Sequence, residues 1–83
     1  MEEKTLTAAQ KKYLAAIYKL DSKGNGIRSI SIGKTLNVSR ASVSIMMDRL
    51  VEDGYVTKEK YGSVYLTPEG RKLGRKYARN TAR

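Results

Sequence analysis

Residues 32–43 read IGKTLNVSRASV, a stretch whose pattern is typical of two helices joined by a tight turn. The isoleucine and the leucine in it are four residues apart, so they share one face of a helix. The asparagine that follows tolerates the left-handed backbone conformation found where helices end. Ser29 and Ser39 are of a residue type that caps the start of a helix. The stretch predicts a helix over about residues 30–36, a tight turn, and a second helix over about residues 40–53.

The predicted helix over residues 40–53 has two distinct faces. Apolar residues recur along one of them at spacings of three and four, as in a helix that packs on a core. This stripe consists of Val43, Met46, Met47, Leu50 and Val51. The other face is polar apart from one isoleucine, so we expect it to lie at the surface.

The sequence upstream predicts one more helix, over about residues 8–22. Thr7-Ala8-Ala9-Gln10 fits a capping box, in which the two polar side chains each bond the other residue's backbone N–H. An apolar stripe at helical spacing follows, made of Tyr13, Leu14, Ile17, Tyr18 and Leu20. Two glycines and an asparagine at residues 24–26 then predict a turn.

The sequence downstream changes from helical spacing to alternation, which is typical of strands. Residues 55–66 predict a β-hairpin with its turn at residues 60–63, and Ile27-Arg28 is typical of a short strand. Thr67-Pro68-Glu69 combines a capping hydroxyl, a proline at the first helical position and a carboxylate near the positive end of the helix dipole. A last helix is therefore expected over about residues 68–79.

The expected order of elements is helix, helix-turn-helix, hairpin and helix. This order indicates a mainly α fold with a small β-hairpin, namely a winged helix-turn-helix with a three-helix core, a wing and a C-terminal helix. With 83 residues the chain has room for one such domain, which we expect to occupy residues 1–83.

The amino-acid composition excludes several kinds of site and favours one kind of partner. The chain contains no cysteine and no histidine, which excludes disulfides, thiolate or imidazole metal sites, and nucleophiles activated by histidine. Its 17 Lys and Arg against 8 Asp and Glu give a formal charge of +9, which favours nucleic acid as the partner. No apolar run is long enough to cross a membrane and no signal peptide is evident, so we expect a cytoplasmic protein. From its charge and its lack of catalytic residue types, we expect that it binds double-stranded DNA and is not an enzyme.

The helix over residues 40–53 is expected to read the DNA, because the first turn of such a helix projects into the major groove. The candidate contacts from this helix and its cap are Ser39, Arg40, Ala41, Ser42, Ser44, Ile45 and Arg49. Arg40 is suited to guanine or phosphate, the serines to phosphates or bases, and Ile45 either to thymine methyl groups or to the edge of the core. The candidate contacts from the wing and the neighbouring backbone are Arg28, Lys58, Lys60, Tyr61 and Gly62.

Four stretches of the chain resemble the diphtheria-toxin-repressor family of metal-dependent repressors, including its manganese-responsive branch. They are YLAAIY at residues 13–18, IGKTLNVS at residues 32–39, Ser42-Val43, and YGSVYLTPEG at residues 61–70. The resemblance covers the family's N-terminal DNA-binding domain and implies a transcriptional repressor with this fold. Members of the family continue into a helical dimerisation domain that supplies most of the metal ligands.

The resemblance also identifies positions where the family holds its regulatory metal. Lys12 and Ala15 stand at two ligand positions of the first helix, and Thr81 falls near the position of a ligand histidine. An ammonium group repels a divalent cation and a methyl group has no donor atom. We therefore expect neither a regulatory metal nor any other cofactor.

Other interpretations stay open at this point. A winged helix also serves as an RNA-binding or protein-binding module, because a fold does not determine its partner. A homodimer through the first and fourth helices is one expected assembly, since regulators often double their DNA contacts by two-fold symmetry. A monomer and an excised domain of a longer protein are the alternatives.

Overall fold

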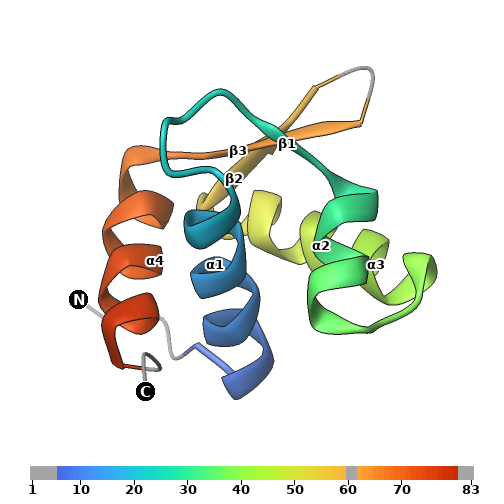
Figure 1. Ribbon diagram of the computed structural model, residues 1–83, viewed down its shortest axis with the longest axis horizontal. Coiled ribbons are helices and arrows are strands. Elements are labelled where there is room, and N and C mark those ends of the chain that lie inside the picture. Colours follow the sequence, from blue (N-terminus) through green and yellow to red (C-terminus); the bar gives the residue numbers. More distant parts are fainter. Residues whose placement is uncertain (1–5, 60–61, 81–83) are drawn as a thin grey trace.

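The computed structural model describes residues 6–59 and 62–80, and its elements follow the order of a winged helix. They are α1 (Ala8–Leu20), β1 (Ile27–Arg28), α2 (Ser29–Leu36), α3 (Arg40–Glu52), β2 (Val56–Lys58), β3 (Ser63–Leu66) and α4 (Pro68–Asn80). Figure 1 shows α1 and α4 side by side, α2 and the start of α3 at the other end of the molecule, and the sheet along one edge. The expected fold class is confirmed. None of the helices in the described part of the chain is long and apolar enough to cross a bilayer.

The sheet has three strands rather than the two of the predicted hairpin. Its order is β1-β3-β2, with both pairings antiparallel. Ile27 pairs with Val64 on one side of β3, and Val56 pairs with Leu66 on the other. The Ser29 N–H, just after β1, also donates to the Gly62 carbonyl at 3.4 Å. The central strand β3 is therefore paired on both edges, and β1 ties the wing to the start of α2.

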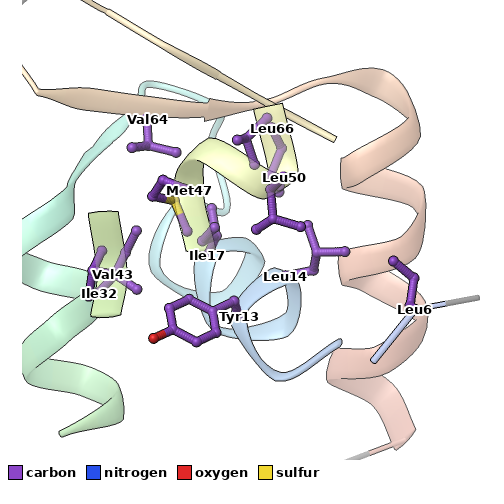
Figure 2. Close-up of a cluster of buried hydrophobic side chains, with 11 residues drawn as sticks. Leu6, Tyr13, Leu14, Ile17, Ile32, Val43, Met47, Leu50, Val64 and Leu66 are labelled. Carbon is purple, nitrogen blue, oxygen red and sulfur yellow. The ribbon is translucent and has the colours of Figure 1, made fainter. Parts of the chain in front are cut away.

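The core lies between the helices and beneath the sheet. Figure 2 shows side chains from α1, α2, α3 and β3 converging in one cluster. The fully buried members with the largest side chains are Leu14, Ile17, Ile32, Met47, Leu50, Val43, Val56 and Val64. Leu20 and Val51, which were expected in the apolar stripes, are each 40% exposed. Both lie at the edge of their stripe, where the helix surface already turns toward solvent.

The end of α1 is set by a buried carboxylate. Asp21 is four residues after Ile17, so it continues the buried face of the helix and is only 4% exposed. Its two oxygens accept from the backbone N–H groups of Asn25 and Gly26, both at 2.8 Å. The turn closes through Gly24 and Gly26 with φ of 79° and 93°. These bonds end the helix at Leu20, two residues before the predicted end.

Local capping explains where three helices begin. The Thr7–Gln10 capping box is present at α1, and the Ser39 hydroxyl accepts from the Ser42 N–H at 3.1 Å at α3. Thr67 accepts from the Gly70 N–H at 3.1 Å at α4. The expected cap of α2 is wrong, because Ser29 is already the first helical residue and pairing within the sheet holds the chain before it.

Two glycines of α4 allow the helix to touch its neighbours at backbone distance. A Cβ added at Gly74 would lie 2.8 Å from the Leu14 carbonyl oxygen and 2.9 Å from the Tyr18 Cβ, both on α1. A Cβ at Gly70 would lie 2.8 Å from the carbonyl carbon of Tyr55 and nearer still to its oxygen. Real Cβ atoms do not make such contacts, so both positions require glycine.

Candidate nucleic-acid interface

The first half of α3 is held rigidly and yet presents its side chains to solvent. Val43, Met47 and Leu50 fix the helix in the core, where each is at most 1% exposed. The side chains just before and just after the first anchor are exposed, namely Arg40, Ala41, Ser42, Ser44 and Ile45. Ile45 is 68% exposed, so of its two expected roles the packing at the core edge is wrong. A rigid helix with an exposed first turn is the arrangement that reads the edges of bases.

The cap of α3 determines what the serines can do. The Ser39 hydroxyl accepts the Ser42 N–H and donates to the Ser42 Oγ at 3.0 Å. Both hydroxyls are thus aligned at the positive end of the helix dipole, where backbone N–H groups attract anions. Ser39 therefore acts first as a structural cap of the helix.

Predicted contacts from α3, from β2 and from the wing turn line one shallow depression. Arg40 and Ser44 of α3, Lys58 of β2 and Gly62 of the wing turn all line it. Residues of α2 and the following turn that sequence reasoning missed also line it, namely Ser29, Ile30, Lys34, Asn37 and Val38. The signal for two of them was available, because Lys34 and Ile30 lie off the Ile32–Leu36 face and are exposed.

The other predicted contacts lie outside this depression. Ser42 and Ile45 line a second hollow on the side of α3 that faces α1, together with Lys12 and Tyr13. Arg28 and Arg49 are exposed and line neither hollow. Helix α3 thus presents one set of side chains toward the wing and another toward α1.

An ion pair joins the wing to α3. Lys58 Nζ lies 2.7 Å from an Asp48 carboxylate oxygen of α3. The two side chains are 38% and 68% exposed, so water screens the pair strongly. Lys58 is therefore held toward the recognition helix by a weak interaction that a stronger anion can replace.

The tip of the wing turns at Gly62, with φ of 86°, and the Gly62 N–H donates to the Glu59 carbonyl at 3.1 Å. This left-handed conformation favours glycine, as the sequence indicated. Lys60 and Tyr61, the other predicted wing contacts, lie outside the described residues.

The positions that resemble metal-ligand positions do not fit a divalent cation. On α1, Lys12 is exposed and Ala15 is buried, so they offer an ammonium and a methyl group. Thr81 lies outside the described residues. Within the described part of the chain no three acidic side chains lie close enough to share a metal ion.

The architecture and this surface define a class. A helix-turn-helix whose second helix exposes its first turn beside a basic wing is the DNA-binding domain of a winged-helix transcriptional regulator. More particularly, the chain belongs to the iron-dependent repressors through their N-terminal DNA-binding domain, whose family model matches residues 5–64. This match confirms the resemblance seen in the sequence.

Two curated relatives are both HTH-type transcriptional regulators named MntR. The HTH-type transcriptional regulator MntR of Lysinibacillus sphaericus (strain C3-41) is 36% identical over 70 residues, which are 84% of this chain and 50% of that protein. The HTH-type transcriptional regulator MntR of Geobacillus kaustophilus (strain HTA426) gives the same identity and coverage. The chain therefore spans about half the length of the curated relatives it matches.

Two solved structures with this fold are of the regulator MarR from E. coli. The reduced form of MarR from E. coli superimposes with a TM-score of 0.75 and 30% identity, over 89% of this chain and 52% of that chain. A mutant of MarR from E. coli, solved in complex with operator DNA, gives a TM-score of 0.73 and 30% identity over 89% and 54% of the two chains. Family and fold are thus those of DNA-binding transcriptional regulators and not those of enzymes.

Proposed function

We propose that this chain binds double-stranded DNA sequence-specifically and represses transcription, with the first turn of α3 in the major groove and the wing along the adjacent backbone. The observation that carries the proposal is the exposed first turn of α3, with Arg40 and Ser44 beside Lys58 around one depression. The operator complex of the MarR mutant supports it, because that domain has the same fold.

The proposed contacts divide into two groups. Arg40, Ser42, Ser44 and Ile45 are exposed on α3 and reach base edges, with Ala41 close to them and the helix start at Ser39 near a phosphate. The second group contacts the sugar-phosphate backbone and consists of Arg28, Arg49, Lys58, Lys60, Tyr61 and Gly62. The first group supplies specificity, and the second supplies affinity that depends on salt.

A binding assay separates this function from an RNA-binding or protein-binding module. We expect tighter binding to duplex DNA than to single-stranded RNA of the same composition, with an affinity that falls steeply as salt rises. Equal affinity for the two nucleic acids, or an affinity that ignores salt, would contradict the proposal.

Replacing Asp48 with asparagine is expected to tighten binding to every duplex about two- to fivefold at low salt. The change frees Lys58 from its partner and removes a negative charge from the face that approaches the phosphates. Fluorescence anisotropy over a salt series measures the effect, which should include a steeper salt dependence. Glu52→Gln, at an exposed position one turn further along α3, is the matched control and should change affinity less. Binding by Asp48→Asn that is no tighter than that of the control would place Lys58 outside the interface.

We propose that DNA binding by this chain needs no metal, since its side chains do not fit one at the family's ligand positions. Adding a chelator should leave the affinity for duplex DNA within about twofold, and adding Mn²⁺ or Fe²⁺ should not raise it more than Mg²⁺ does. Anisotropy titrations of chelator-treated protein test this. A rise in DNA affinity with one transition metal, beyond that with Mg²⁺, would overturn the proposal that binding needs no metal.

We expect two copies to pair through α1 and α4, placing two recognition helices on half-sites about 34 Å apart. An open groove beside α1 offers apolar surface for this contact, lined by Ala8, Ala16, Leu20, Leu36 and Tyr77. Lysines 11, 12 and 19 also line the groove and repel their counterparts, so pairing should strengthen as salt rises. Sedimentation equilibrium should show a mass twice 9.3 kDa that Leu20→Lys halves. A monomer at every salt concentration would refute this assembly.

A further inference from the structure

The outer face of α4 carries a second concentration of positive charge, which contributes none of the proposed DNA contacts. Four cations at helical spacing line an open depression there, namely Lys72, Arg75, Lys76 and Arg79. All four are exposed, and none forms an ion pair within the described residues. We call this set the α4 cationic face.

This face points away from the recognition helix. The opposite side of α4 packs on α1, with Gly70, Gly74 and Ala78 buried and Leu73 against the core cluster. Figure 1 shows α4 and the start of α3 at opposite ends of the molecule, whose longest extent is 34 Å, with α1 between them. A straight duplex seated on α3 therefore has the helical core between itself and the α4 cationic face.

We propose that the α4 cationic face is a second DNA-binding surface, which binds the phosphate backbone of a duplex other than the one on α3. Residues 72 to 79 span about 10 Å of helix axis, which presents four positive charges over that length. One strand of B-DNA carries a phosphate about every 3.4 Å along its axis, so the charge densities of the two surfaces match closely.

The chemistry of the face favours a nucleic acid over a lipid membrane. A helix that lies on a membrane buries an apolar stripe between acyl chains beside its basic residues. On α4 the apolar side chains Leu73 and Tyr77 are partly buried against the core, and neither lines the depression formed by the four cations. Cations line that depression, as expected for a surface that contacts phosphates.

The consequence is that one copy of this chain bridges two duplexes. The inference rests on the proposed function for the first duplex, and the test separates the two. A biotinylated duplex of mixed sequence is fixed on beads, protein is added, and retention of a second, fluorescent duplex is measured at low salt. We expect the wild-type chain to retain the second duplex.

The test variant carries Lys72→Gln, Arg75→Gln and Lys76→Gln. The matched control carries Lys11→Gln, Lys19→Gln and Lys23→Gln, exposed positions on α1 and its turn that line neither hollow beside α3, and loses the same three charges. We expect the test variant to retain at least about tenfold less of the second duplex than the control does. Their affinities for a single duplex should agree within about threefold, since α3 and the wing are unchanged.

Three results would overturn the inference. The first is equal retention by the test variant and the control. The second is retention that survives in the test variant but is lost in Arg40→Ala, which would assign bridging to the recognition helices of two paired copies. The third is a test variant that bridges normally while losing binding to phosphatidylserine vesicles. Failure of the wild-type chain to bind even the bead-bound duplex would instead remove the proposed function itself.

Discussion

Replacing Gly70 with alanine is expected to destabilise the domain strongly. The new methyl group would overlap the backbone carbonyl of Tyr55. Moving α4 away would break its Thr67 cap, and moving Tyr55 away would break β2, the strand that begins at the next residue. Steric conflicts of this kind cost more than about 3 kcal/mol, which is a large part of the stability of a domain this small.

Circular dichroism during heating measures this effect. Gly70→Ala should lose its cooperative transition or melt more than about 15 °C below the wild-type chain. Lys72→Ala, two residues further along the same helix and exposed, should melt within a few degrees of the wild-type chain. A Gly70→Ala variant as stable as this control would mean that α4 does not approach Tyr55 as closely as the structure has it.

Replacing Arg40 with alanine is expected to have the largest effect on DNA recognition. An arginine that bonds a guanine edge contributes about 1–3 kcal/mol of discrimination, so the preference for the target over other duplexes should fall about 5- to 150-fold. The stability of the fold should not change, because Arg40 is exposed and makes no ion pair within the described residues.

Lys60→Ala provides the contrast. Loss of a backbone contact should weaken binding to all duplexes alike and reduce the salt dependence by about one counterion. Competition assays with target and mixed-sequence duplexes give both quantities for each variant. If the two variants changed discrimination and salt dependence equally, the division between reading by α3 and anchoring by the wing would be wrong.

Much of the fold could be predicted because its signals are local. The Thr7–Gln10 capping box, the Ser39 cap and the left-handed Asn37 each involve residues within a few positions of one another. Such interactions form whatever the rest of the chain does, so the sequence predicts them directly. The order of these local elements then left few architectures to choose from.

What could not be predicted depends on contacts between distant parts of the chain. The short strand at Ile27 was expected, but its place beside Val64 arises only when the wing folds back over the helices. The burial of Asp21, which is 4% exposed, also depends on the elements packed around it, although both of its hydrogen bonds are to the nearby residues 25 and 26. Neither the strand pairing nor this burial has a signature within its own segment.

The same distinction applies to the candidate interface. Each of four contacts could be predicted from its residue type and its element, namely Arg40, Ser44, Lys58 and Gly62. Their position around one depression could not be predicted, and neither could the presence of Lys34 of α2 beside them. Burial of α4 against α1 likewise turns scattered basic residues into a single cationic face that points away from α3.

The central claim is that α3 reads DNA sequence directly and without a metal. Selection from a pool of randomised duplexes, carried out in chelator and followed by sequencing, tests it most directly. We expect enrichment of one sequence motif by the wild-type chain and its loss in Arg40→Ala. A pool no more enriched than the input, or an enrichment that Arg40→Ala leaves unchanged, would contradict it.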